Sequence, residues 1–418
     1  MPTMKYSIVT FGCRVNQADS LRLEEGFRAR GGIASATSEA DVVVVNTCSV
    51  TATADQGARQ SIRRIARDNP TSRIVVTGCY ATRCEAEVAA LPSVVRVVRN
   101  SEKDGLVASL VERGRDGDGP CGAAIEPGVA GRTAFTLRVQ TGCEQTCAYC
   151  IIPSTRGSGR SLPVADVVRE VTRVSACGFR EIALTGVHLG SYGRDLPAPC
   201  ALIDLLRALD RIPIDVVFRI SSLEPMDCTP AIVALVASSG GRFAPHFHLP
   251  LQHASDRMLR LMRRPYSLDH YRRLVDDIHA RLPHASTGSD MMVGFPGETD
   301  EDFRANLDYL PASPLTHLHV FPYSDRPGTA ATAMRDKVDG ITIRERGSRL
   351  RQIGAGLTRR FHAAQSGTTR PALTLEDGSL VVTDNYLKVR IPAGLARNQR
   401  VSVQIREEGG TLRGTVFP

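Results

Sequence analysis

Short apolar runs alternate with amphipathic stretches through the first part of the chain, residues 4–113. The apolar runs lie at 6–11, 42–46 and 74–77. The run Val42-Val43-Val44-Val45 is apolar at every position, as strands buried on both faces of a parallel sheet are. Helical periodicity fills the gaps, at 17–30 and 54–67. This order predicts an N-terminal parallel-sheet α/β domain built from βαβ units.

The same alternation continues through residues 133–340. Strand candidates lie at 135–140, 181–185, 216–220, 246–251, 289–293 and 317–321. Helix candidates lie at 164–176, 201–209, 230–237, 256–263, 268–281 and 301–310. A complete eight-stranded barrel takes about 250 residues, so six strands predict an incomplete (β/α)6 barrel. Its active site is expected at the carboxyl ends of the strands.

The pattern changes again near the C-terminus. A helical stretch at 342–362 is rich in arginine, and five short alternating runs follow it, which predicts a small β-barrel of the nucleic-acid-binding kind. Residues 114–132 are rich in glycine and proline and contain Cys121, so they predict a linker. The predicted domains are therefore 4–113, 133–365 with the basic helix, and 366–418.

Composition narrows the setting of the protein. The chain has 418 residues, 11 cysteines and a formal net charge of +8. The positive charge permits a polyanionic partner. The start of the chain lacks a secretory pattern, and no apolar run reaches the roughly 20 residues that span a bilayer. We therefore expect a cytoplasmic protein with no membrane association, whose cysteines are reduced and partly bound to metal.

Three cysteines lie within eight residues just past the first strand of the predicted barrel. Cys143, Cys147 and Cys150 form C-E-Q-T-C-A-Y-C, and no fourth cysteine follows before Cys177. A fully ligated iron–sulfur cube takes four cysteines, so three would leave one iron open for chemistry. The alternative is a structural zinc knuckle with a distant fourth ligand, although structural zinc sites usually pair two knuckles.

A second set of three cysteines follows from strand spacing. Cys13, Cys48 and Cys79 each stand just past one of the three N-terminal strand runs. Because parallel strands share one carboxyl edge, these thiols are expected to meet there. The alternative is three unrelated buried cysteines, since free cysteine often packs as a small hydrophobe. Cys84 also lies nearby, on a helix predicted at 83–91, but it lacks the strand-end position, so the sequence favours Cys79.

Polar or glycine-rich turns follow the other barrel strands. They supply candidate cofactor-binding residues, because glycine lets backbone amides approach a ligand closely. These candidates are Gly186, His188, Ser221, Gln252 and Gly294. For His188, a hydrogen-bonding structural role is the competing interpretation. Thr299 and Asp302 are spaced like a helix N-cap pair.

The run from Cys143 to Cys150 resembles the signature of the radical S-adenosylmethionine enzymes, with Tyr149 as its aromatic residue. Further motifs extend the resemblance, over nearly the whole chain, to the methylthiotransferases. These are F-G-C-R-V-N-Q at Cys13, N-T-C at Cys48, T-G-C-Y-A at Cys79, G-V-H-L-G-S-Y-G from Gly186 and D-M-M-V-G-F-P-G-E-T from Asp290. The family has an N-terminal methylthiotransferase domain, a radical SAM barrel and a C-terminal TRAM domain.

The resemblance implies two 4Fe–4S clusters and S-adenosylmethionine as cofactors. Cys143, Cys147 and Cys150 would hold the cluster that cleaves the cofactor to a 5′-deoxyadenosyl radical, with Tyr149 at the cofactor. Cys13, Cys48 and Cys79 would hold the second cluster, whose open iron carries sulfur, so Cys48 counts with the catalytic cysteines. A methylthio group would then be transferred to an unactivated carbon. A low-potential electron donor and a sulfur source are the implied partners.

The motifs C-R-V-N-Q, G-V-H-L-G-S-Y-G and H-V-F-P-Y-S-D-R-P-G-T are most similar to the branch that acts on N6-threonylcarbamoyladenosine beside the tRNA anticodon. The isopentenyladenosine branch more often has Gln-Asn at Val187-His188. The ribosomal protein S12 branch usually has proline at Arg14. The chain departs from many relatives at Gln252-His253-Ala254-Ser255, where they carry Gln-Ser-Gly-Ser. The tRNA anticodon loop is thus the expected substrate, and both other branches, and a non-catalytic iron–sulfur RNA sensor, are alternatives.

Overall fold

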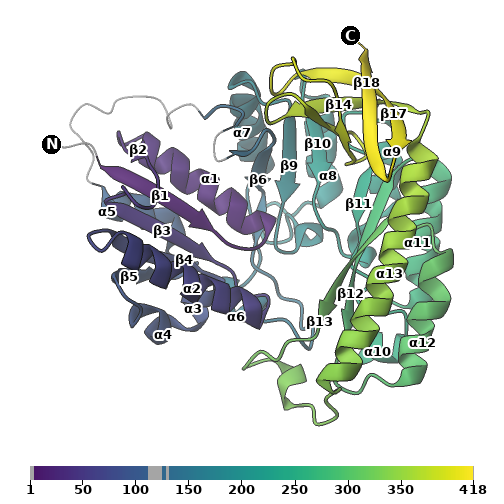
Figure 1. The fold of residues 1–418 in the computed structure, drawn as a ribbon, viewed down its shortest axis with the longest axis horizontal. Helices are drawn as coiled ribbons and strands as arrows, with labels where there is room; N and C mark the ends of the chain where they lie inside the picture. The colour runs from purple at the N-terminus through teal and green to yellow at the C-terminus, as the bar shows by residue number, and fades with distance from the viewer. Residues whose placement is uncertain (1–3, 112–124, 129–130, 418) are drawn as a thin grey trace.

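A five-stranded parallel sheet forms the N-terminal part of the computed structural model, which describes residues 4–111, 125–128 and 131–417 (Figure 1). The strand order is β2-β1-β3-β4-β5. The strands are β1 Lys5–Thr10, β2 Ile33–Ala34, β3 Val42–Thr47, β4 Arg73–Gly78 and β5 Val94–Val98. The helices are α1 Arg14–Arg28, α2 Ala52–Asp68, α3 Cys79–Arg83, α4 Glu85–Ala89 and α5 Leu106–Leu110.

Strand β3 is buried on both faces, as its unbroken apolar run predicts. Val43 and Val45 pack with α2 residues such as Ile62 on one face, and Val42 and Val44 pack in a second cluster on the other. The helix expected at 83–91 is instead two short helices. The chain leaves helical geometry at Cys84, which has φ −125° and ψ 51°.

Six strands in two three-stranded parallel sheets form the central part, with orders β10-β9-β6 and β11-β12-β13. The Phe218–Phe243 bridge continues β10 toward β11, so the sheets curve into an incomplete barrel, as predicted. The strands are β6 Phe135–Arg138, β9 Glu181–Thr185, β10 Val217–Ile220, β11 His246–His248, β12 Ser286–Val293 and β13 His317–Pro322. Two short strands, β7 Gln140–Thr141 and β8 Arg160–Ser161, form a separate antiparallel pair.

Helices connect these strands and bury the apolar core of the barrel. They are α6 Ile152–Arg156, α7 Val164–Ala176, α8 Leu202–Arg211, α9 Pro230–Ser238, α10 Asp256–Leu261, α11 Leu268–Arg281, α12 Asp300–Tyr309 and α13 Gly340–Gln365. Helix α12 begins with the expected capping box between Thr299 and Asp302. Helix α13 runs along β13 (Figure 1). None of the helices among the described residues is both long and apolar enough to cross a membrane.

The arginine-rich helix α13 has exposed arginine side chains and others that pack against the barrel. Arg346 is buried and pairs with Glu298 at 3.2 Å and Asp300 at 2.7 Å. Arg360 donates to the carbonyl oxygens of Pro311 and Ser313. These side chains hold the helix to the barrel. Five of the six arginines on this helix are exposed, namely Arg344, Arg349, Arg351, Arg359 and Arg360.

The C-terminal strands close into the small barrel that the alternating runs predict. Its order is β14-β15-β16-β18-β17. The strands are β14 Thr369–Leu375, β15 Leu380–Thr383, β16 Lys388–Arg390, β17 Arg400–Glu408 and β18 Thr411–Phe417. The three predicted domain boundaries stay predictions. Cys121 of the predicted linker lies outside the described residues, and Ile125, also in that segment, is buried in the core of the central barrel.

Candidate active site

Three cysteines of the N-terminal sheet meet at its carboxyl edge. Strands β1, β3 and β4 are neighbours in register, with Thr10 beside Asn46 and Thr47 beside Gly78. Cys13 therefore follows β1 as the N-cap of α1, while Cys48 and Cys79 are the residues directly after β3 and β4. The parallel register is what brings together thiols that are more than 30 residues apart in sequence.

The glycines before these cysteines allow the close approach. Gly12 has φ +88°, and a Cβ built on it would lie 2.4 Å from the Cys48 Sγ. Burial raises the pKa of Cys48 to about 11, and the neighbouring Cys13 and Cys79 thiols contribute in the same direction. Without a cation nearby, the Cys48 thiol keeps its proton at neutral pH. A bound metal centre would deprotonate its cysteine ligands, as thiolate ligation requires.

A buried cationic network lies against Cys79. Asp19 accepts from Lys103 at 2.9 Å and from Arg156 at 3.2 Å, and it also pairs with Arg138. Burial opposes ionisation of Asp19, but these cations hold its pKa below the usual range. Burial also opposes the charge on Arg156, yet Cys79, Asp19 and Cys13 raise its pKa. Three cations around one carboxylate suit a neighbouring site of three thiolates.

The second cysteine set lies in the loop between β7 and α6. Cys150 N–H donates to the Cys147 carbonyl at 3.1 Å, and Cys143 N–H donates to the Gly157 carbonyl at 2.9 Å. Burial raises the pKa of Cys150 to about 12, and its neighbours Cys147 and Cys143 contribute to that shift. Arg264 donates to the Cys147 Sγ at 3.2 Å. Three converging thiols with no fourth cysteine among them fit a cluster with one open position.

The predicted cofactor residues spread over the barrel rim and do not all face one space. Gly186 and Ser221 line the main cavity of the molecule. Tyr149 packs edge-on against Phe295, with 6.4 Å between ring centroids. Gln252 has φ +68° and is held by β12, to which its N–H donates at Asp290 O.

Two of these rim residues have structural explanations. The glycine at 294 is required by helix α13, since a Cβ there would lie 2.3 Å from Ile343. His188 Nε2 lies 2.7 Å from Asp227 Oδ2. Burial opposes protonation of His188, but its hydrogen bonds with Asp227 and Cys143 raise its pKa to about 9. His188 is therefore hydrogen-bonded, as a structural role would require, and it lies beside the second cysteine set.

One cavity of about 870 Å³ is lined by all three parts of the chain. The N-terminal sheet contributes Cys13, Arg14 and Cys48, and the C-terminal barrel contributes Tyr386. The remaining lining includes Gly186 and Ser221 of the rim and four histidines of the barrel strands, His246, His248, His317 and His319. A cavity of this size matches the usual range for sites that enclose a small-molecule group.

Two family models match the chain. Residues 137–310 match the radical SAM superfamily, and residues 5–99 match a family described as uncharacterized protein family UPF0004. The threonylcarbamoyladenosine tRNA methylthiotransferase MtaB of Aquifex aeolicus is 35% identical over 400 residues, which cover 93% of this chain and 96% of the relative. The chain belongs to the radical SAM methylthiotransferase family.

Other methylthiotransferases match with similar coverage. MtaB of Bacillus subtilis is 33% identical over 91% of this chain and 88% of its own. A tRNA-2-methylthio-N(6)-dimethylallyladenosine synthase of Chloroflexus aurantiacus is 35% identical over 84% of this chain and 77% of its own. In fold, this family member is similar to a radical S-adenosylmethionine methyltransferase of Kitasatospora setae, TsrM. The TM-score is 0.56, with 16% identity, over 79% of this chain and 77% of that one.

Sequence reasoning placed the six cysteines of this methylthiotransferase family member but missed two polar clusters. The network around Asp19 joins residues from β6, α1, α6 and the segment before α5, with no local pattern to mark it. The histidines of the cavity could have been found from their spacing in the sequence. His246-Phe-His248 and His317-Leu-His319 each put two histidines on one face of a strand, because side chains alternate with a period of two.

Proposed function

We propose that this protein is a tRNA methylthiotransferase that converts N6-threonylcarbamoyladenosine beside the anticodon to its 2-methylthio derivative. The observation that carries the proposal is the pair of three-cysteine sets, one at the carboxyl edge of the parallel N-terminal sheet and the other in the loop between β7 and α6. Helix α6 lies between the two sets. It begins two residues after Cys150 and ends at Arg156, whose pKa is raised by the neighbouring Cys79 thiol. The names and coverage of the relatives support the same activity.

Each cysteine set would hold one 4Fe–4S cluster with one iron open, Cys143, Cys147 and Cys150 for one, and Cys13, Cys48 and Cys79 for the other. When bound, these clusters and S-adenosylmethionine supply a radical that removes hydrogen from carbon, and the sulfur and methyl group that replace it. Arg264 and His188 would fix the thiolates of the barrel set, since they contact Cys147 and Cys143. Arg156 and Lys103 would offset the negative charge of the other set.

The rim residues Tyr149, Gly186, His188, Ser221, Gln252 and Gly294 would form the surroundings of the cofactor. Gly186 and Ser221 favour this because they line the cavity that Cys13 and Cys48 also line. A low-potential electron donor and a sulfur source would be needed as partners. The exposed arginines of α13 and the closed C-terminal barrel would contact the anticodon arm.

Two cysteine variants test whether the two cysteine sets have different roles in the reaction. Cys143→Ala should abolish formation of 5′-deoxyadenosine from S-adenosylmethionine under anaerobic reduction. Cys48→Ala should still form it, yet add no sulfur to tRNA. The measurements are chromatography of the cofactor products and mass spectrometry of tRNA nucleosides. Equal behaviour of the two variants would contradict the assigned roles. A wild-type protein that forms no 5′-deoxyadenosine would instead be a non-catalytic iron–sulfur RNA binder.

A second substrate, N6-dimethylallyladenosine, deserves a direct comparison because the Chloroflexus aurantiacus relative named for it is also 35% identical. Nucleoside analysis of tRNA from a strain that lacks this gene separates the two. The proposal expects loss of the 2-methylthio group from threonylcarbamoyladenosine alone. Loss from the dimethylallyl nucleoside alone would transfer the assignment to that branch.

A further inference from the structure

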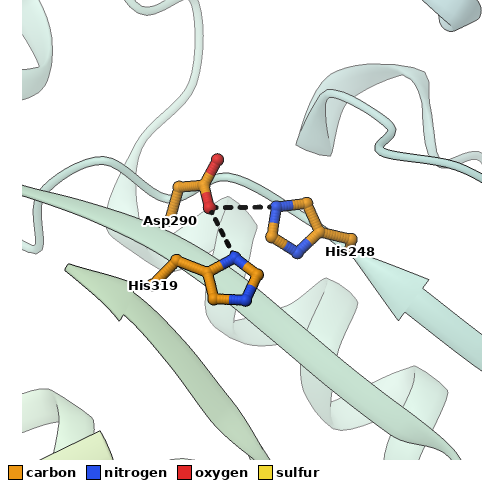
Figure 2. A group of neighbouring side chains, drawn as sticks. All are labelled: His248, Asp290 and His319. Carbon is orange, nitrogen blue, oxygen red and sulfur yellow. Dashed lines mark hydrogen bonds and ion pairs between the residues drawn. The ribbon is translucent and has the colours of Figure 1, made fainter. Parts of the chain in front are cut away.

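Two histidines and one aspartate converge on the barrel wall of the cavity (Figure 2). They come from three neighbouring parallel strands, His248 from β11, Asp290 from β12 and His319 from β13. His248 Nε2 lies 3.1 Å and His319 Nδ1 lies 3.2 Å from the same Asp290 oxygen, Oδ1. Because all three stand on strands and not on loops, their geometry is set by the sheet.

The cluster presents charge to the cavity. Burial opposes ionisation of Asp290, but the hydrogen bonds from His248 and His319 hold its pKa below the usual range. The bond to Asp290 raises the pKa of His319. His319 is also the most accessible member, with 56% of its side chain exposed, against 25% for Asp290 and 16% for His248. The Asp290 carboxylate and the His319 imidazole therefore both face the cavity.

The rest of the cavity is rich in hydrogen-bond donors. Arg14 and Asp290 are the only Lys, Arg, Asp or Glu side chains among the described residues that line it. Arg14 donates to the hydroxyl of Tyr386 at 2.8 Å, and the part of the chain that the structure describes offers it no carboxylate. The Nδ1 atom of His246 is buried without a hydrogen-bond partner among the described residues. Hydroxyls of Ser286, Thr316 and Thr358 also line it, together with apolar side chains such as Val15 and Phe321.

This lining discriminates between the two substituents that the relatives' names carry. A threonylcarbamoyl group has a carboxylate, a hydroxyl and urea N–H groups, whereas a dimethylallyl group is a hydrocarbon. Urea N–H groups are donors for Asp290, and a carboxylate is an acceptor for His319 and Arg14. A hydrocarbon in the same place would displace water from these polar groups and form no hydrogen bond with them. Sites built from buried polar groups bind such an analogue much more weakly.

We infer that His248, Asp290 and His319, with Arg14, form the subsite for a charged, hydrogen-bonding substituent on the target nucleoside. This inference rests on the proposed function. Cys13 and Cys48 line the same cavity, so a nucleoside held here by its substituent lies within the space that the sulfur-carrying set also faces. His319 and Asp290 contact the substituent, while His248 positions the carboxylate of Asp290.

Two imidazoles and one carboxylate also match the donor set of a divalent transition metal. The distances favour the hydrogen-bonded arrangement, because both ring nitrogens lie at hydrogen-bonding distance from one and the same oxygen. The charge of Asp290 is then satisfied by two N–H groups. A metal ion is accordingly an outcome that the test must be able to reveal.

The test compares two anticodon stem-loop RNAs, one with N6-threonylcarbamoyladenosine and one with N6-isopentenyladenosine at the target position. Cluster-loaded wild type, His319→Phe and His319→Gln are assayed anaerobically for RNA affinity and for kcat and KM of methylthiolation. His279→Phe, on the exposed side of α11, is the matched control for adding a phenyl ring. Iron content and cleavage of S-adenosylmethionine report whether each variant retains its fold and both clusters.

We expect wild type to prefer the threonylcarbamoyl RNA, and His319→Phe to reduce that preference about ten- to a hundredfold. The change should appear in the affinity and KM for that RNA, with affinity for an unmodified stem-loop unchanged. His319→Gln, which keeps a hydrogen-bonding group, should fall between. His279→Phe should match wild type.

Two results would overturn the subsite. One is an unchanged preference in His319→Phe that has normal iron content. The other is one equivalent of Zn²⁺ or Co²⁺ bound by wild type and lost in His319→Phe, which would make the cluster a metal site. Failure of the proposed function looks different, because wild-type protein would then methylthiolate neither RNA or the isopentenyl RNA alone.

Discussion

The buried carboxylate of Asp19 holds together side chains from several parts of the chain. It is buried and shares its two oxygens among Lys103, Arg138 and Arg156, which come from different parts of the chain. Arg156 also donates to Asn16 at 2.6 Å, and Lys103 donates to Asn46 at 3.1 Å. The Asp19 side chain thus joins the N-terminal part of the chain to helix α6, which follows the second cysteine set.

Replacing Asp19 by asparagine should be strongly destabilising. Asp19→Asn leaves three buried or half-buried cations without their shared counter-charge, and we expect a loss of about 3–5 kcal/mol in the free energy of unfolding. Anaerobic denaturant titration measures it. The control is Asp104→Asn, since Asp104 also pairs with Arg138 but is 64% exposed, and its loss should cost under about 1 kcal/mol. Similar losses in both variants would show that Asp19 has no special position.

At the residue scale, the sequence predicted what is marked locally or by strand spacing. Cys143, Cys147 and Cys150 are close in sequence, and Cys13, Cys48 and Cys79 recur at strand ends. Asp19 and Arg156 carry no such mark, because their pairing depends on how the N-terminal and central parts of the chain pack. Burial of an ion pair is decided by tertiary contacts, which neither composition nor periodicity contains.

At the element scale, the turns that end β3 and β4 control where the cysteines lie. Gly78 is the last residue of β4, directly before Cys79, and has φ +100°. A Cβ there would lie 2.1 Å from the backbone oxygen of Thr47, directly before Cys48. Backbone atoms of two paired strands cannot yield as a flexible side chain can, so this glycine sets the distance between two of the three thiols.

Gly78→Ala should therefore remove the N-terminal cluster and leave the barrel cluster intact. We expect the iron content to fall toward that of one cluster, with S-adenosylmethionine still cleaved and no sulfur added to tRNA. Gly31→Ala is the matched control. Gly31 also has positive φ, +77°, but its Cβ would meet nothing within 4 Å, so only backbone strain of about 1–2 kcal/mol is expected. Full iron content in Gly78→Ala would contradict this account.

Element types were predictable from periodicity, whereas breaks within elements were not. The strand run at 181–185 matches β9, and the five short C-terminal runs form the five strands of the closed barrel. The run at 135–140 instead divides after Arg138, where the chain leaves the barrel sheet to pair with β8. Such a break depends on the partner strand, so the apolar pattern of one segment cannot show it.

At the scale of the whole molecule, the positively charged side chains have two different roles. The net charge of +8 permits a polyanionic partner, and the arginines of α13 are candidates for contact with its phosphates. The structure divides that helix, because Arg346 and Arg360 are used in packing against the barrel. Arg344, Arg351 and Arg359 remain exposed for contact with RNA phosphates.

The salt dependence of RNA affinity measures how many of these arginines contact phosphates. For binding to an anticodon stem-loop, each phosphate contact on single-stranded RNA contributes about −0.7 to the slope of log affinity against log salt. Replacing Arg344, Arg351 and Arg359 together by alanine should make the slope shallower by up to about 2. The control replaces Arg63, Arg64 and Arg67 by alanine. These residues are exposed on α2, and replacing them removes the same amount of positive charge. Equal changes in both triple variants would mean that net charge, not α13, governs binding.

Tyr386 stands in the turn between β15 and β16 with φ +71°, and it reaches all three parts of the chain. Its hydroxyl accepts from Arg14, its ring lies 4.7 Å from the Arg219 guanidinium, and His246 lies 4.6 Å away. The C-terminal barrel is thus not an interchangeable module. A chimaera that borrows this barrel from a relative would have to import the tyrosine turn together with its counterparts at positions 14, 219 and 246, or the reaction chamber would lose one of its walls.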